Sequence, residues 1–177
     1  LQHHARGCYT AVSRIKRDNR ACEHALLTAE KAAALAHLLT GAAYPHTALT
    51  HAWQNVLFNQ FHDILAGTSL REACEDAYEG YEESLRIAGQ TRDEALGTLA
   101  ARVDTRGEGR CLFVFNPLPW ARSGPVCTTL VPTRRWNEDW AGLYRPGAVR
   151  LTDESGREVS CQVTALEHHG AHYRVHV

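Results

Sequence analysis

The sequence lacks several patterns, and each absence removes a class of function or origin. It contains no methionine among its 177 residues, and it begins at Leu1. We therefore expect the chain to be a piece of a longer or processed protein. No apolar run reaches the roughly 18 residues that a membrane-spanning helix needs, so no membrane partner is expected. The N-terminal segment also lacks the basic, apolar and small-residue order of a secretory signal.

An excess of charge of one sign is also absent. Lysine and arginine number 19, aspartate and glutamate number 20, and the formal net charge at pH 7 is −1. Binding to nucleic acid requires a basic face, so nucleic acid is not expected as a partner. Six cysteines without a C-x-x-C pair are too sparse for a disulfide scaffold. We expect free thiols in a reducing compartment, and hence a cytoplasmic location.

Alanine and valine divide the chain into two parts. Residues 1–101 hold 20 of the 25 alanines, and residues 102–177 hold nine of the 11 valines. Alanine favours helix because ordering it loses no side-chain entropy, whereas branched valine favours strands. We predict an α+β fold: a three-helix domain over 1–103, a polar linker over 104–110, and the start of an incomplete antiparallel β-sandwich domain over 111–177.

Apolar residues at spacings of three and four predict three helices in the first part. The first covers about 12–39, the second about 47–62, and the third starts after Ser69 and reaches the linker. Ser69 and Glu72 form a capping-box pattern for the third helix. Helices of this length need neighbours, so a bundle is the economical packing. Glycine inside the third helix, at Gly80, Gly89 and Gly97, predicts a close helix approach or a bend there.

Short apolar segments predict strands in the second part. The segments are 111–115, 126–131, 148–152, 157–167 and 171–177. Residues 153–156, DESG, predict a hairpin turn between two of them. The last segment alternates apolar and polar side chains and stops without a turn. We therefore expect the sheet to continue beyond Val177.

Eleven histidines suggest a metal site, but spacing excludes the two pairs near the C-terminus. The H-E-x-x-H pattern of many zinc enzymes is absent. His168 and His169 are adjacent on a predicted strand and point to opposite faces, so they cannot hold one ion together. His172 and His176 share a face but lie about 13 Å apart, which is too far for one zinc ion.

His62 and Asp63 stand in a different setting, where the second predicted helix ends within the stretch 59–70, NQFHDILAGTSL. Residues at helix ends are presented to partners by a stiff scaffold. From the residues alone, two interpretations stay open. The pair either belongs to a binding site, or His62 is a helix-terminal histidine stabilised by the helix dipole. In the second interpretation Gly67 ends the helix and Ser69 caps the next one.

The stretch 59–70, preceded by Trp53, resembles the signature of the α-mannosidases of glycoside hydrolase family 38. Residues 1–10 resemble the entry into the middle domain of that family. Residues 115–120, FNPLPW, resemble the opening of its C-terminal β region. The three likenesses occur in the family's order, and they thin out after about residue 130.

The resemblance implies a zinc-dependent retaining α-mannosidase with an N-terminal α/β barrel, a three-helix middle domain and C-terminal β-sandwiches. One Zn²⁺ ion would be held by a histidine and two aspartates of the barrel and by the middle-domain histidine, a role that falls on His62. Asp63 would hydrogen-bond hydroxyls of the mannose ring. The nucleophile and the acid/base would lie on the barrel, outside this chain, so the piece alone is expected to be inactive. The expected substrate is a terminal α-mannoside or oligosaccharide, and the expected partners are the barrel and the other β domains.

Ala66 departs from the family pattern, because many relatives carry proline there. The change would loosen the loop but remove no ligand. Two other functions stay open from the sequence. One is a catalytically silent module for carbohydrate binding or assembly, and the other is a sibling hydrolase that acts on a small mannosyl compound. An upstream barrel with a His-x-Asp pair would favour the enzyme over the silent module.

Overall fold

The computed structural model divides by its internal contacts into two units, Leu1–Trp120 and Ala121–Val177. The structure describes residues 4–106, 109–130, 149–169 and 172–176. Helices fill the first unit and short strands lie in the second. This arrangement confirms a mostly helical α+β chain with a small antiparallel sheet. The domain boundaries predicted from composition stay a prediction.

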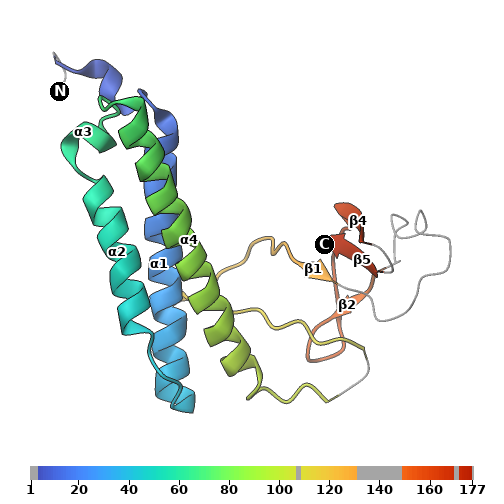
Figure 1. Ribbon diagram of the computed structural model, residues 1–177. Coiled ribbons are helices and arrows are strands. Elements are labelled where there is room, and N and C mark those ends of the chain that lie inside the picture. Colours follow the sequence, from blue (N-terminus) through green and yellow to red (C-terminus); the bar gives the residue numbers. More distant parts are fainter. Residues whose placement is uncertain (1–3, 107–108, 131–148, 170–171, 177) are drawn as a thin grey trace. The chain divides into compact units, whose positions relative to one another are not determined.

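Three long helices and two short ones occupy the described part of the first unit. They are η1 (Arg6–Tyr9), α1 (Ser13–Thr40), α2 (His46–Asn59), α3 (His62–Leu65) and α4 (Arg71–Ala100). Figure 1 shows α1, α2 and α4 side by side, with the single turn α3 at the end of the bundle where the N-terminus lies. None of the described helices is both long and apolar enough to cross a membrane.

The second predicted helix is interrupted. The helix predicted over about 47–62 is present as α2, but its end is misplaced, because α2 ends at Asn59 and the separate turn α3 begins at His62. Val56 and Ile64 are both buried and are eight residues apart, a spacing that a continuous helix would also produce. Apolar periodicity therefore could not reveal the break.

The predicted capping box is also wrong. The N-cap of α4 is Leu70, whose backbone is extended, and no side chain hydrogen-bonds to the cap. Since Ser69 lies one residue before the cap, its hydroxyl is displaced from the position that a capping box requires. Glu72 still lies in the first turn of α4, where its charge complements the helix dipole.

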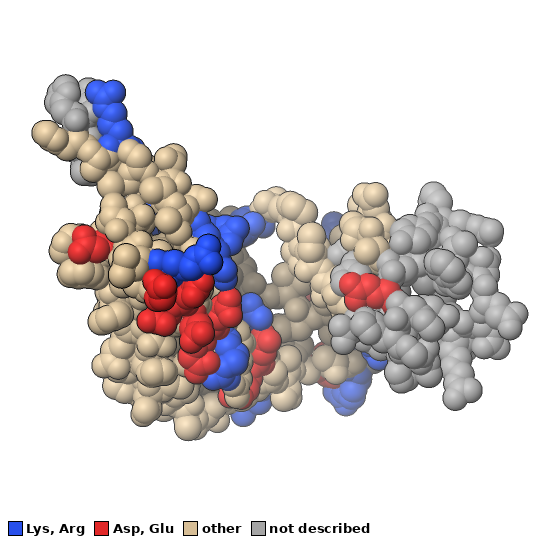
Figure 2. Space-filling view, turned by 45° about the horizontal axis from the view of Figure 1, so that its top comes forward, with Lys and Arg blue, Asp and Glu red and all other residues tan. Residues whose placement is uncertain are grey.

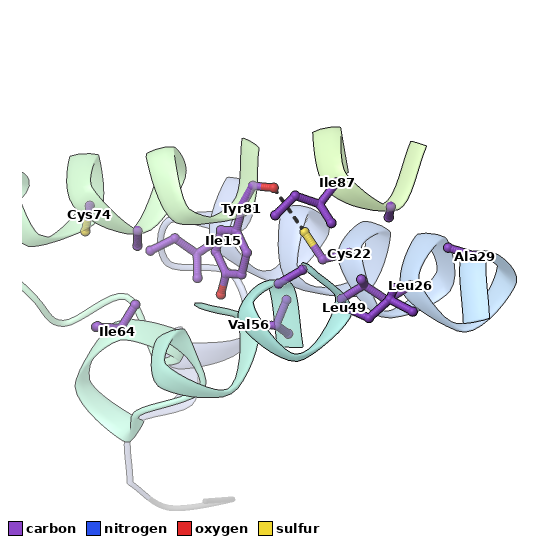
Figure 3. Close-up of a cluster of buried hydrophobic side chains, with 13 residues drawn as sticks. Ile15, Cys22, Leu26, Ala29, Leu49, Val56, Ile64, Cys74, Tyr81 and Ile87 are labelled. Atoms are coloured by element: carbon purple, nitrogen blue, oxygen red, sulfur yellow. Dashed lines mark hydrogen bonds between the residues drawn. The ribbon is translucent and has the colours of Figure 1, made fainter. Parts of the chain in front are cut away.

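The core lies along the inner faces of α1, α2 and α4 (Figure 3). The predicted apolar stripe of the first helix is confirmed as buried: Ile15, Cys22, Leu26, Ala29, Ala33 and Ala36. Small alanines let the helix backbones approach closely. The close approach predicted at Gly80 is confirmed, because a Cβ atom there would lie 3.0 Å from Nδ2 of Asn59 on α2. At Gly89 and Gly97 a Cβ atom would meet nothing within 4 Å, so no close approach is found there.

Buried polar groups cross the interface between α2 and α4. The amide Nδ2 of Asn59 donates to the carbonyl of Ala77 at 3.3 Å, and the hydroxyl of Tyr81 donates to the carbonyl of Asn59 at 3.5 Å. The hydroxyl of Ser84 lies 3.1 Å from the carbonyl oxygen of Ala52. We call Asn59, Tyr81 and Ser84 the polar seam. Because each of these side chains is hydrogen-bonded, the seam avoids the penalty of burying unpaired polar groups.

The thiol of Cys22 is fully buried and donates to the carbonyl of Tyr81 at 3.4 Å (Figure 3). Burial raises the pKa of this thiol from 9.0 to about 12, and the nearby carboxylates of Asp18 and Glu23 add to the effect. The unfolded chain releases this proton near pH 9, whereas the folded chain retains it up to about pH 12. The stabilisation is therefore complete below pH 9 and is lost as the pH rises through that window, by at most about 1.4 kcal/mol per pH unit.

We accordingly expect the free energy of unfolding to fall less steeply with pH in Cys22→Ala than in the wild type. Urea unfolding between about pH 8 and 10.5 measures the difference. Cys74→Ala, a second buried cysteine variant, keeps the Cys22 thiol and should retain the wild-type slope. Equal slopes in the wild type and Cys22→Ala would contradict the assignment.

The described strands of the second unit form one small sheet and one hairpin. They are β1 (Thr129–Leu130), β2 (Leu151–Thr152), β3 (Glu158–Val159), β4 (Ala165–His169) and β5 (His172–His176). The sheet has the antiparallel order β1-β5-β4, and β2 pairs antiparallel with β3. The hairpin turn predicted at 153–156 is confirmed. Its Asp153 carboxylate accepts hydrogen bonds from the backbone N–H groups of Ser155 and Arg157, each at 2.9 Å.

The other strand predictions had mixed outcomes. Residues 111–115 form no strand, although they are apolar and fully described. Parts of the predicted strands at 126–131, 148–152 and 171–177 lie outside the described residues. A sandwich of two packed sheets stays a prediction.

Candidate functional site

His62 and Asp63 occupy the first two positions of α3. Their side chains are 80% and 57% exposed, and Nε2 of His62 lies 3.5 Å from Oδ1 of Asp63. Ile64, the next residue, is buried in the core. This single turn therefore attaches itself to the bundle through Ile64 and presents an imidazole and a carboxylate together to the outside. Both residues predicted from the sequence are thus brought side by side.

The helix-terminal interpretation of His62 is correct in that Gly67, with φ at +77°, follows the C-cap of the helix, but that helix is the single turn α3 and not α2. The helix α2 ends at Asn59, and Gln60 is its C-cap. His62 lies beyond the last turn of α2, where stabilisation by that helix dipole would act. Its ring contacts the ring of Phe61, with centroids 4.3 Å apart, but it remains mostly exposed.

A pocket of about 510 Å³ opens beside His62. The helix α1 lines it with Lys16, Asn19 and Arg20, and the segment around α3 lines it with Gln60, His62 and Leu65. The wall near His62 thus combines two cations with two side-chain amides. The rest of the lining, Cys8, Tyr9, Leu65 and Ala66, is mostly apolar, and both cations are already paired, Lys16 with the Ala11 carbonyl and Arg20 with Glu23.

A hydrogen-bond network joins this wall to the inside of the bundle. Nε2 of Gln60 donates to Oδ1 of Asn19 at 3.3 Å and to Oε1 of Glu23 at 3.0 Å. Nδ2 of Asn19 donates to the same Glu23 oxygen at 3.2 Å, and Arg20 pairs with the other one. The sequence analysis missed this network. The spacing of Asn19 and Glu23 by four residues was a weak signal, but nothing local indicates a partner 41 residues away.

The loop after α3 is packed tightly against the segment that precedes α1. Gly67 has a φ of +77°, and a Cβ atom there would lie only 2.7 Å from the carbonyl oxygen of Ala11. The ammonium group of Lys16 donates to that same carbonyl. The backbone N–H of Thr68 donates to the carbonyl of Asp63 at 3.1 Å, so the loop also folds back onto α3. Gly67 is needed here for both its backbone conformation and its missing side chain.

The acidic residues of α4 form an exposed face in which charges of both signs alternate (Figure 2). Glu83 pairs with Arg86 at 2.8 Å, and this contact lowers the pKa of the Glu83 carboxyl. Glu82 pairs with Arg14 of α1 at 2.9 Å. Among the described residues, this face singles out no pair of carboxylates for acid and base catalysis.

The residues that the structure describes show no complete metal site. A protein zinc site takes three or four ligands at about 2.0–2.3 Å. Within the described ranges, no group of three or more His, Cys, Asp and Glu side chains is placed to hold an ion. His62 is an exposed imidazole with one carboxylate beside it. It fits the role of a single ligand to an ion whose other ligands come from elsewhere.

Comparison with known protein families gives a match over residues 3–99 to the family described as the alpha mannosidase middle domain. Among curated proteins, human alpha-mannosidase 2C1 is 35% identical over 117 residues, which are 66% of this chain and 11% of that protein. Alpha-mannosidase G of Dictyostelium discoideum is 35% identical over 99 residues, or 53% of this chain and 9% of that protein. The chain thus spans about a tenth of the length of these relatives.

Two solved structures share the fold. A glycosyl hydrolase family 38 protein from Enterococcus faecalis matches 98% of this chain with a TM-score of 0.72 and 22% identity. An α-mannosidase from Enterococcus faecalis V583 matches 96% of it with a TM-score of 0.69 and 21% identity. The chain covers 23% and 22% of these two chains. At this identity the likeness concerns the fold.

Proposed function

The chain belongs to the alpha mannosidase middle-domain family, and from this premise we propose that it is part of a zinc-dependent retaining α-mannosidase. In this proposal His62 supplies one ligand to the zinc ion, and Asp63 binds hydroxyls of the terminal mannose. The substrate is an α-mannoside or an oligosaccharide that ends in one.

One observation carries the proposal for these residues. The two side chains lie 3.5 Å apart, both are exposed, and they share one turn of helix that Ile64 fixes to the core. A ligand imidazole and a sugar-binding carboxylate must reach the same small volume, because a metal that contacts the sugar lies within a few ångströms of it. A stiff helical element also keeps such groups within the narrow tolerance that a site requires.

The chemistry of the two residues follows from their types. A neutral imidazole offers one nitrogen lone pair to a metal, and a carboxylate accepts hydrogen bonds from two hydroxyls. When bound, zinc would act as a Lewis acid that orients the sugar and stabilises developing charge. Asp63 would hold the ring in the pose that exposes the glycosidic bond. A charged hydrogen bond of this kind is worth about 1.5–3 kcal/mol.

Bond cleavage needs groups that we assign to another part of the enzyme. Retaining glycosidases use two carboxylates about 5–5.5 Å apart, one as nucleophile and one as acid/base. The acidic face of α4 offers no such pair beside His62. Because the chain spans only 11% of human alpha-mannosidase 2C1, we propose that both carboxylates lie on an N-terminal barrel of a longer protein. The strands of the second unit would begin a β-sandwich domain, and the six free cysteines suit a cytoplasmic location.

The test is an assay of the longer protein that carries this chain, beside the 177-residue chain alone. We expect the longer protein to hydrolyse an aryl α-mannoside and to lose activity when a chelator removes zinc, which added zinc should restore. The isolated chain should show no activity above buffer, because one imidazole and one carboxylate cannot complete the reaction.

Two outcomes would contradict this proposal. A longer protein that binds mannosides without hydrolysing them would favour the catalytically silent module. Activity of the isolated chain, with contaminating enzyme excluded, would show that the nucleophile has been placed in the wrong part. A substrate panel that includes small mannosyl compounds separates an oligosaccharide hydrolase from a sibling enzyme.

A further inference from the structure

We infer that Glu23 is a positioning residue for His62 and that it acts through the side chain of Gln60. The metal role of His62 rests on the function proposed above. The positioning itself is a property of this chain, so it can be tested without metal or substrate.

The inference starts from the junction between α2 and α3, which consists of two residues. The backbone N–H groups of Gln60 and Phe61 donate to the carbonyls of Leu57 and Phe58 at 3.2 and 3.1 Å. These bonds stay within the last turn of α2. Buried Asn59 and Ile64 attach the two sides of the junction to α4 and to the core, so a side chain of the junction itself is needed to attach it to α1. Phe61 is itself exposed and extended, and His62 follows it directly.

The side chain of Gln60 provides the connection to α1. Its two hydrogen bonds, to Oε1 of Glu23 at 3.0 Å and to Oδ1 of Asn19 at 3.3 Å, join the junction to the middle of a 28-residue helix. Both acceptors are well shielded, since Asn19 is 6% exposed and the Glu23 side chain is 21% exposed. Hydrogen bonds to an ionised acceptor are stronger than neutral ones, and shielding from water preserves that strength.

Glu23 is the centre of the network. One of its oxygens accepts from both Gln60 and Asn19, and Arg20 neutralises the other. Asn19, Arg20, Gln60 and His62 all line the same pocket. The network therefore forms the pocket wall next to the imidazole. His62 follows Gln60 by two residues, so a loss of the Gln60 hydrogen bonds would let His62 move. Displacements of about 1 Å are large on the scale of a metal or substrate site.

The chain offers a matched control on the same helix. Glu30 also lies on α1 and also accepts a hydrogen bond from α2, in its case from Nε1 of Trp53 at 3.1 Å. Glu30→Ala removes a comparable bridge between the same two helices, seven residues farther along α1 from Glu23. A general loss of bundle stability should appear in both alanine variants, whereas a loss of His62 positioning should appear only in Glu23→Ala.

The first experiment measures the NMR order parameter of the His62 backbone N–H in the 177-residue chain. We expect a value near that of rigid backbone, about 0.85, in the wild type and in Glu30→Ala, and about 0.6 or lower in Glu23→Ala. Gln60→Ala removes the donor instead of the acceptor and should give the same loss, so the test does not depend on the folding of one variant. Glu23→Gln keeps an amide oxygen that can accept from Gln60, and it should rescue most of the order.

The inference is overturned if Glu23→Ala and Gln60→Ala leave the His62 order parameter unchanged, or if Glu30→Ala lowers it equally. A low value in the wild type would also overturn it, since nothing would then be positioned. In the longer enzyme, zinc affinity measured by chelator competition should weaken about 10- to 100-fold in Glu23→Ala and much less in Glu23→Gln. If the order parameters behave as expected but zinc affinity is unchanged even in His62→Ala, the metal role in the proposed function fails while the positioning stands.

Discussion

His62→Ala in the longer enzyme should lower the zinc content and reduce α-mannosidase activity by at least about a hundredfold. The reason is that the substitution removes a ligand itself, and even changes to groups that only support a ligand lower affinity or activity 10- to 100-fold. The imidazole is 80% exposed, so its loss should change the free energy of unfolding by no more than about 0.5 kcal/mol. Metal analysis, activity with and without excess zinc, and thermal unfolding together measure these effects.

Asp63→Asn is the informative partner of that variant. Asparagine keeps the shape of the side chain but removes its charge, and Asp63 is assigned to the sugar. Zinc should therefore remain bound, while the loss of one charged hydrogen bond, about 1.5–3 kcal/mol, should lower kcat/KM about 10- to 150-fold. If His62→Ala retains full zinc, His62 is no ligand. If Asp63→Asn loses zinc as well, the two residues do not divide their work as proposed.

Gly67→Ala should destabilise the helical unit by about 2–5 kcal/mol. Two free-energy costs contribute. The first is conformational: with φ at +77°, the left-handed backbone disfavours any Cβ atom by about 1–2 kcal/mol. The new methyl group would also lie 2.7 Å from the Ala11 carbonyl oxygen, and relieving such overpacking costs about 1–3 kcal/mol. Denaturant unfolding of the 177-residue chain measures the sum.

Gly41 provides the control for the second cost. It has nearly the same backbone conformation, with φ at +78°, but a Cβ atom there would meet nothing within 4 Å. Gly41→Ala should therefore show the conformational penalty alone, about 1–2 kcal/mol. Equal destabilisation by the two substitutions would mean that the loop after α3 can move away from Ala11 without a measurable cost in free energy.

The helices show what the amino-acid sequence could predict and where it could not. Apolar periodicity identified the inner face of α1 correctly from Ile15 to Ala36, because both alanines and larger apolar residues recur at helical spacing on that face. On α4 it missed Ser84, which is fully buried, because a hydroxyl that is hydrogen-bonded to a carbonyl is as well accommodated as an apolar group. Leu57 and Leu70 also fit the apolar spacing of the predicted helices, yet both are exposed.

For the candidate site, too, one part could be predicted from the sequence and another could not. His62 and Asp63 could be singled out because a local stretch of residues resembles a family signature. The support around them could not, since Gln60, Asn19 and Glu23 meet only after α2 has returned along α1. The packing of Gly67 beneath Ala11 was equally hidden, because that contact joins segments 56 residues apart and depends on the missing Cβ atom.

The polar seam between α2 and α4 has a consequence for the axial register of the two helices. Apolar and alanine faces are nearly uniform along a helix, so α2 could slide by one turn, about 5.4 Å, and still bury similar area. A slide of that size would separate the Asn59 amide from the Ala77 carbonyl and the Ser84 hydroxyl from Ala52. The Asn59 amide, left buried and unpaired, would cost about 1–3 kcal/mol, whereas the Ser84 hydroxyl would keep its 2.8 Å hydrogen bond to the Gly80 carbonyl within α4. The seam therefore fixes the axial position of α2 along α4. It thereby also sets the height along the bundle at which α2 ends and the imidazole of His62 is presented.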